Sequence, residues 1–191
     1  MIADETRVTS TVWTIGHSTR PLKTFLNLLA HYRLEAVADV RRFPGSRQQP
    51  QFAQEPLRCA LAEHGIAYEW IVTLGGRRRP RPDSPNVTWR NVSFRGYADY
   101  IASAEFAEGL DELLEVAGRL RTTMMCAEAV WWRCHRALIS DVLCVQGIEV
   151  VHILDQTHTV VHPYTSPARI VQGRLTYVPA EGEPLAHTSA D

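Results

Sequence analysis

The chain has 191 residues, of which 45% are hydrophobic, and a formal net charge of -1. This length supports one domain with a sizeable core, and the near-zero charge excludes a protein whose whole surface binds polyanions. No run of about 18 apolar residues is present, so we expect no membrane span. The polar segment 1–11 does not resemble a signal peptide, which predicts a cytoplasmic protein with reduced cysteines.

Short apolar segments predict five strands, over residues 12–15, 36–41, 68–72, 124–125 and 148–154. Between them, apolar residues at helical spacing predict helices over residues 21–29, 56–64, 97–120 with a break near Ser103, and 129–145. Cys59 and Cys144 fall within these helical patterns and are predicted core residues. Segments 170–171 and 175–177 predict a small hairpin around Gln172 and Gly173.

Strands that alternate with helices predict an α/β fold. We expect a single, doubly wound, mainly parallel five-stranded sheet with helices on both faces and a small C-terminal hairpin. The expected strand order is 3-2-1-4-5, in one domain over residues 11–178, with flexible tails at 1–10 and 180–191.

Polar side chains of reactive types follow several of these strands. His17 follows the first strand, Asp39 and Arg41 end the second, and Cys126 and Glu128 end the fourth. Ligands of open α/β sheets bind outside the carboxyl ends of the strands. The expected order places His17 beside Cys126, with Asp39 and Arg41 one strand further out, so we predict one polar cleft at this edge.

The motifs at these positions, together with several others, also carry a family resemblance. They are Thr14-Ile15-Gly16-His17-Ser18, Asp39-Val40-Arg41, Leu74-Gly75-Gly76, Phe94-Arg95-Gly96-Tyr97-Ala98, Cys126-Ala127-Glu128, Trp132-Arg133-Cys134-His135-Arg136 and His162-Pro163-Tyr164-Thr165. In this order they resemble the domain-of-unknown-function family 488, over roughly residues 11–178. The resemblance implies a small cytosolic α/β domain and brings no settled activity, so function must be argued from the site.

Cys126 is the predicted reactive centre. At a helix N-terminus near arginines, the pKa of a thiol falls and the reactive thiolate forms; the alternative is a small buried residue at a strand end. Six residues separate Cys126 from Arg133, one more than in the phosphate loop of thiol phosphatases, and two tryptophans replace the small residues that such a loop needs. Glu128 is either a general base or a brace for Arg136.

A metal site is not expected in this segment. Cys134 and His135 are adjacent in the predicted helix, so their side chains would point about 100° apart. Their spacing also departs from standard zinc patterns, in which ligand pairs lie two to four residues apart. His135 is predicted to be a packed, hydrogen-bonded histidine. The alternative ligand set is Cys126, Cys134 and His135, with His17 as a fourth member.

Six arginines and a single acidic residue, Asp83, occupy the predicted loop from Arg77 to Arg95. Arginine suits bidentate recognition of phosphate, although a GC-rich genome would produce the same bias, in which 19 of 20 basic residues are arginine. Arg95 and Tyr97, near Trp89 and Arg90, suit a nucleobase with its phosphate. The alternative is a solvated loop that Trp89 anchors to the body.

These patterns favour an enzyme that acts on a phosphate-bearing, nucleotide-like or nucleic-acid substrate. Cys126, Glu128 and His17 are its catalytic candidates, Arg41, Arg133 and Arg136 would bind the anion, Asp39 would pair with Arg41 or contact substrate, and the Arg77–Arg95 loop would be a lid. The alternative function is a non-catalytic module that binds nucleic acid or a protein partner, with the cluster as a structural brace. The sequence assigns no cofactor and no oligomeric state.

Overall fold

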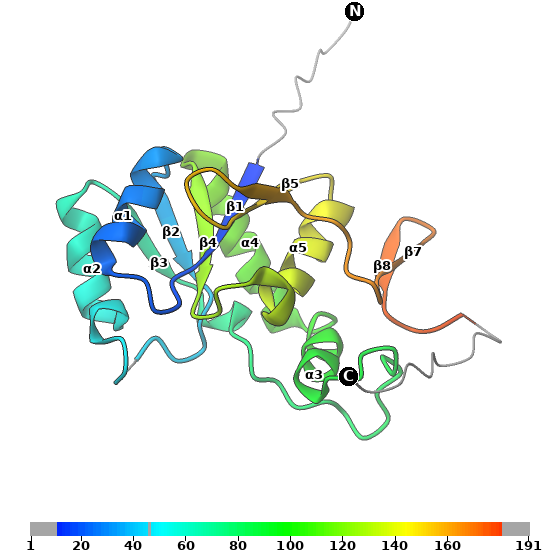
Figure 1. Ribbon diagram of the computed structural model, residues 1–191. Helices are drawn as coiled ribbons and strands as arrows, with labels where there is room; N and C mark the ends of the chain where they lie inside the picture. Colours follow the sequence, from blue (N-terminus) through cyan, green and yellow to red (C-terminus); the bar gives the residue numbers. More distant parts are fainter. Residues whose placement is uncertain (1–10, 46, 181–191) are drawn as a thin grey trace, which may run out of the picture.

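The computed structural model describes residues 11–45 and 47–180, and these form a six-stranded sheet with helices on both faces (Figure 1). The strand order is β3-β2-β4-β1-β5-β6, and only β6 is antiparallel to its neighbour. The strands are β1 (Thr11–Gly16), β2 (Ala36–Asp39), β3 (Ala67–Trp70), β4 (Thr122–Cys126), β5 (Glu149–Ile153) and β6 (Thr159–Val161). The predicted α/β class with a mainly parallel sheet is confirmed.

The predicted strand order is wrong in one respect, because β4 lies between β2 and β1. Gly16 pairs with Cys126 on one side of β4, and Asp39 pairs with Met125 on the other. The predicted count of five strands is also wrong, since β6 adds an edge strand that carries no strong apolar run. The consequence is that Cys126 ends a central strand, with the ends of β1 and β2 on either side.

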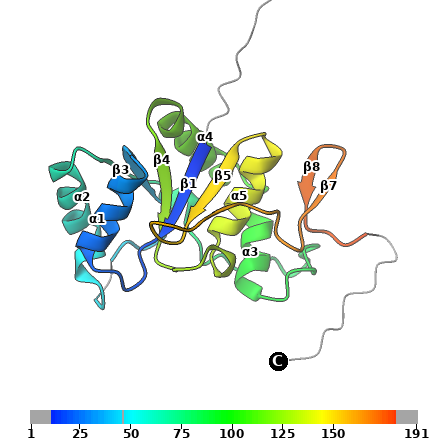
Figure 2. The same cartoon turned by 45° about the horizontal axis from the view of Figure 1, so that its top comes forward.

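Helices cover both faces of the sheet (Figure 2). On the first face, α1 (Leu22–His31) and α2 (Gln54–Glu63) bury residues at helical spacing, such as Phe25, Leu28 and Leu29. The opposite face carries α4 (Ala104–Arg119) and α5 (Arg136–Val145), and α3 (Val92–Tyr100) packs beside α4 beyond the carboxyl edge of the sheet. The break predicted near Ser103 is confirmed, because the Ser103 side chain caps α4 by accepting from the Phe106 N–H.

The segment after β4 is not the long helix that the sequence predicts. A short 3-10 turn, Trp131–Arg133, comes first, and α5 begins only at Arg136. Trp132 is 52% exposed. Cys126 is therefore followed by an irregular connection, and the arginines and cysteines of this segment can point in directions that a continuous helix would forbid.

The arginine-rich loop is held against the body by its own polar contacts. The Asp99 carboxylate, on α3, accepts hydrogen bonds from the Arg81 N–H, the Ser84 hydroxyl and the Asn86 amide at 2.6–2.8 Å. Trp89 packs on Phe94 and on Tyr177. The contacts of Trp89 match the alternative interpretation, in which it anchors the loop to the body, and Asp99 holds residues 81–86 against α3.

The C-terminal hairpin is confirmed as β7 (Arg169–Val171) paired with β8 (Arg174–Thr176). Cys59 is exposed, so its predicted core position is wrong, because it lies on the solvent face of α2. Cys144 is half-buried. The predicted N-terminal tail, and all but Ala180 of the predicted C-terminal one, lie outside the described residues. Within residues 11–45 and 47–180, every helix is too short or too polar to cross a bilayer.

Gly16 is the position where the chain can least accept a side chain. A Cβ atom there would lie 1.9 Å from the Glu128 carbonyl oxygen, because the segment after β4 crosses directly over the end of β1. The same approach lets the His17 N–H donate to the Cys126 carbonyl at 3.0 Å and the Ser18 N–H to the Ala127 carbonyl at 2.9 Å. Because Gly16 has no side chain, β1 and the Cys126–Glu128 segment can approach each other closely.

We predict that Gly16→Ala lowers the free energy of unfolding by about 1–3 kcal/mol, the usual cost of overpacking. Urea denaturation would measure the loss. Gly118→Ala is the matched control, because Gly118 lies in α4 with open space at its Cβ position, and alanine there should stabilise by roughly 0.5–1 kcal/mol. A Gly16→Ala protein as stable as the parent would contradict the close approach.

Candidate functional site

A cleft of about 350 Å³ lies at the carboxyl edge of the sheet. Residues from the ends of β2 and β4, the start of the arginine-rich loop, α3 and the segment before α5 surround it. They are Arg41, Arg42, Phe43, Gly45, Gly76, Arg77, Ser93, Phe94, Cys126, Ala127, Glu128, Arg133, Cys134 and His135. Four arginines and one glutamate line it, so the cleft is strongly cationic.

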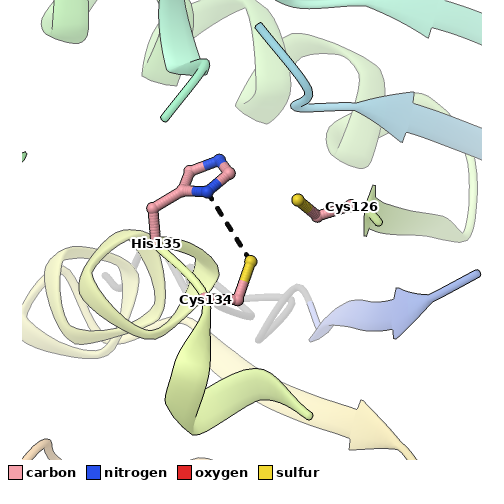
Figure 3. A group of neighbouring side chains, drawn as sticks. All are labelled: Cys126, Cys134 and His135. Atoms are coloured by element: carbon pink, nitrogen blue, oxygen red, sulfur yellow. Dashed lines mark hydrogen bonds between the residues drawn. The ribbon is translucent and has the colours of Figure 1, made fainter. Parts of the chain in front are cut away.

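Two thiols and one imidazole converge in the wall of this cleft (Figure 3). The Cys126 and Cys134 sulfurs and a His135 ring nitrogen all lie within 4.8 Å of one another, and Cys134 Sγ is 3.6 Å from His135 Nδ1. The His135 Nε2–H donates to the Val40 carbonyl at 2.9 Å, which fixes the ring with Nδ1 toward the sulfurs. The prediction of a hydrogen-bonded His135 is confirmed.

Local backbone geometry explains why adjacent residues can face one point. Cys134 ends the 3-10 turn in an extended conformation, with φ -127° and ψ 146°, and His135 is the cap residue of α5. The 100° separation of neighbouring helical side chains therefore does not apply here. The premise that argued against a shared ligand set, a helix running through Cys134, is wrong.

Arg136 lies behind the cluster and is 1% exposed. Its Nη2 donates to the Glu128 carbonyl at 2.6 Å, its Nη1 to the Thr14 hydroxyl at 3.3 Å and its Nε to Cys134 Sγ at 3.4 Å. The predicted brace of Arg136 by the Glu128 side chain is wrong, because Arg136 binds the Glu128 backbone carbonyl instead. The Glu128 carboxylate is left exposed at the cleft.

The two thiols differ in their acidity. Burial alone would raise the pKa of Cys134, but the hydrogen bond from Cys126 and the charges of His135 and Arg136 outweigh it and hold that pKa well below its ordinary value. The pKa of Cys126 is raised, first by its hydrogen bond to Cys134 and then by burial. These directions make Cys134 the more acidic thiol of the pair, whereas the sequence favours Cys126.

A buried hydrogen-bonded chain runs from Arg136 to the C-terminal segment. Thr14 is hydrogen-bonded to His152 Nδ1 at 2.6 Å, and His152 Nε2 to His162 Nδ1 at 2.8 Å. His162 Nε2 donates to the Asp141 carboxylate at 3.0 Å. Asp141 also accepts from the hydroxyls of Thr165 and Tyr177, so the last described segments are tied to the site.

A second buried group positions Arg41. The Arg41 Nε donates to both Asp39 oxygens, at 2.8 and 3.0 Å, and the Tyr68 hydroxyl donates to Asp39 at 2.7 Å. Arg41 Nη1 donates to His17 Nε2 at 3.2 Å, across the end of β4. His17 stacks on Phe52 and is 3% exposed. Of the two roles predicted for Asp39 and Arg41, the ion pair is therefore present.

The structure sorts the predicted site residues into three groups. Cys126, Glu128, Arg41 and Arg133 line the cleft, as does the alternative metal set Cys126, Cys134 and His135. His17, Asp39 and Arg136 lie behind it and hold its wall. Tyr97 and Arg95 lie outside its lining: the Tyr97 hydroxyl donates to the Leu74 carbonyl, and Arg95 Nε donates to the Trp89 carbonyl.

Sequence reasoning missed several cleft residues: Arg42, Phe43, Ser93 and Phe94, and it treated Arg77 only as part of a lid. Arg42 directly follows the predicted second strand, and this place at the strand end of a parallel sheet is the signal that could have found it. Arg77 lies further from its strand, because β3 ends at Trp70 and a 3-10 turn, Val72–Leu74, comes before Gly75 and Gly76.

This geometry defines a doubly wound α/β protein with a cationic, thiol-containing cleft at the carboxyl edge of its sheet. The chain belongs to the family described as domain of unknown function DUF488, whose sequence profile matches residues 21–143. The resemblance seen in the sequence is thereby confirmed. Neither a curated protein nor a solved structure gave a match.

We predict that Asp39→Asn lowers the free energy of unfolding by about 3–5 kcal/mol, because it leaves the buried Arg41 guanidinium without its counter-charge. Chemical denaturation at neutral pH would measure the loss. Glu55→Gln is the control, since Glu55 pairs with Arg58 at the surface and should leave the transition unchanged. Equal behaviour of the two variants would contradict a structural role for Asp39.

The pH dependence of the free energy of unfolding should reveal the lowered pKa of His17. Burial lowers its pKa to about 4, with Arg41 contributing, so the folded state keeps it neutral while the unfolded chain binds a proton below about pH 6.5. The stabilising effect of His17 is therefore full above that pH and declines by up to about 1.4 kcal/mol per unit as pH falls. Denaturation of the parent and of His17→Gln between pH 7.5 and about pH 5 tests this expectation. A difference between their free energies of unfolding that stays constant over this pH range would contradict it.

Proposed function

We propose that this protein is an enzyme that acts on a phosphate-bearing, nucleotide-like or nucleic-acid substrate bound in the cleft. One observation carries the proposal: cationic arginines from separate chain segments surround a cleft whose wall contains the Cys126, Cys134 and His135 cluster. Anion-binding groups and reactive groups thus share one cavity, which is the arrangement that substrate binding and chemistry require.

Some arginines of the cleft are held by other protein groups, and others have guanidiniums that can bind a ligand. Arg41 is held by Asp39, and Arg42 Nη1 donates to the Arg77 carbonyl at 3.0 Å. The exposed side chain of Arg133 has no ion pair within the described residues, and its planar fork of donors suits a phosphate oxygen pair. We assign phosphate binding to Arg133 and Arg77, with Arg42 supporting them.

Aromatic rings at the cleft favour a nucleotide over a simple anion. Phe43 is 64% exposed, and the half-buried Phe94, which packs on Trp89, lines the same cleft. The exposed ring of Phe43 next to arginines offers stacking for a base while the guanidiniums hold the phosphate. The chemistry is assigned to the thiol cluster, with the exposed carboxylate of Glu128 as its acid or base and His17 acting through Arg41.

Calorimetric titration with a nucleoside monophosphate and the matching nucleoside tests the binding. The monophosphate should bind and the nucleoside should not. Arg133→Met should weaken binding about 10- to 100-fold, because it removes charged hydrogen bonds worth about 1.5–3 kcal/mol. Arg119→Met, which changes a surface arginine paired with Glu115, is the control. Undiminished affinity in Arg133→Met and Arg77→Met would contradict the assignment.

Turnover distinguishes the enzyme from a binding module. Chromatography of a panel of nucleotides and oligonucleotides should reveal a product that Cys134→Ser no longer forms, although it still binds. Salt-dependent binding of an oligonucleotide with no product from any member of the panel would favour the module instead.

A further inference from the structure

The Cys126, Cys134 and His135 cluster has the composition of a metal site. It is the one group of three or more such donors found close together among residues 11–45 and 47–180. The thiols are 7% and 2% exposed, so their sulfurs are shielded from bulk water but still reach the cleft. Two cysteines and one histidine are a donor set that catalytic zinc uses, with the fourth position left for water or substrate.

The spacing of the donors suits a tetrahedral ion. At the tetrahedral angle, ligands at about 2.3 Å for sulfur and about 2.05 Å for nitrogen lie about 3.6 Å apart for a sulfur–nitrogen pair and about 3.8 Å apart for two sulfurs. Cys134 Sγ and His135 Nδ1 are 3.6 Å apart, and all three donor atoms fall within 4.8 Å. An ion therefore requires the donor atoms to approach one another by about 1 Å at most.

The contacts around the donors also suit a metal. Ligating histidines almost always donate their second ring N–H to a carbonyl or carboxylate, and His135 Nε2 donates to the Val40 carbonyl at 2.9 Å. Arg136 Nε donates to Cys134 Sγ at 3.4 Å, and no carboxylate contacts Arg136 within the described chain. A buried guanidinium beside a sulfur favours the anionic thiolate that a metal requires.

We propose that Cys126, Cys134 and His135 Nδ1 bind one zinc ion whose fourth position opens into the arginine-lined cleft. This inference deepens the proposed function, and its catalytic part rests on that function, whereas the ion site rests on the donor geometry alone. The competing states of the same atoms are a reduced thiol pair, hydrogen-bonded to His135, and a disulfide between Cys126 and Cys134.

The position of Glu128 suggests what the ion would do. Zinc deaminases hold the ion with one histidine and two cysteines, and a glutamate that is not a ligand moves the proton of the bound water. Here Glu128 follows the ligand Cys126 by two residues and lines the same cleft. We assign Glu128 the acceptance of one proton from a water molecule at the fourth position, and the ion, held by Cys126, Cys134 and His135, would supply the Lewis acidity that lowers the pKa of this water.

Metal content and a cobalt spectrum test the site directly. Protein purified with reductant and without chelator should contain about one zinc per chain by mass spectrometry. Cobalt-substituted protein should show intense sulfur-to-cobalt charge transfer and the visible bands of tetrahedral coordination. Cys126→Ser, Cys134→Ser and His135→Gln should each lose most of the zinc or change the bands, whereas a protein with both Cys59→Ser and Cys144→Ser should match the parent.

A variant that keeps all three ligands tests whether the loss of zinc in the ligand variants comes from unfolding. A Cβ at Gly76 would lie 2.8 Å from His135 Nδ1, so Gly76→Ala should displace the ring and weaken zinc binding about 10- to 100-fold. Gly45→Ala, also in the cleft but with open space at its Cβ, should leave the affinity unchanged. Competition with a chromogenic chelator measures both affinities.

The inference is overturned if the parent holds no stoichiometric zinc and its cobalt spectrum lacks charge transfer, or if thiol titration of the reduced, cobalt-treated protein still counts four free cysteines. Recovery of a Cys126–Cys134 disulfide from freshly purified protein would also overturn it. Nucleotide titration and the turnover assay separate the two proposals: binding that depends on Arg133 together with product formation in metal-free protein upholds the proposed function even if the zinc site fails.

Discussion

The buried guanidinium of Arg136 is the constraint on which the site depends. One side chain, 1% exposed, reaches the Glu128 carbonyl, the Thr14 hydroxyl of β1 and the sulfur of Cys134. A charge in this position must satisfy its donors within the protein, because an unpaired buried cation is expensive. The chain after β4 therefore has to fold back over β1, and Gly16 gives it the space. Cys134 and the Cys126–Glu128 segment meet because of this requirement.

The hydrogen bond between Arg136 and Thr14 connects the site to the C-terminal part of the chain. From Thr14, a series of hydrogen bonds runs through His152 and His162 to Asp141, whose carboxylate also accepts from Thr165 and Tyr177. Burial keeps the pKa of His152 far below its ordinary value, so that this link remains uncharged. The family profile ends at residue 143, yet this network lies on both sides of that limit. Hydrogen bonds thus connect the β6–β8 region to the wall of the cleft.

The sequence predicts what depends on local pattern and misses what depends on distant contacts. Apolar runs locate β1 to β5, and strand ends locate Cys126, Glu128 and Arg41 in the cleft, whereas Arg133 reaches the cleft from the 3-10 turn before α5. Strand order is set by how whole strands pack, so nothing near β4 reveals that it lies between β2 and β1. Residues 129–145 are apolar enough for the predicted helix, but Arg136 contacts Cys134, which is extended, and α5 begins only at Arg136. This departure from a continuous helix creates the three-donor cluster, against which the predicted helix argued.

The abundance of arginine has a structural reason that the charge pattern conceals. Loops at the carboxyl ends of strands leave backbone carbonyls without partners, and these must be satisfied when they are shielded from water. Arginines bind many of them: Arg20 donates to Leu154 and Gly16, Arg41 to Phe52, Arg78 to Gly75 and Thr73, Arg95 to Trp89, and Arg136 to Glu128. A lysine has no rigid fork with which to reach two acceptors at once. Clusters of arginine in this sequence therefore mark loop carbonyls as well as candidate ligand sites. Arg133, whose guanidinium donates to no carbonyl among residues 11–45 and 47–180, is the more informative position for an anion.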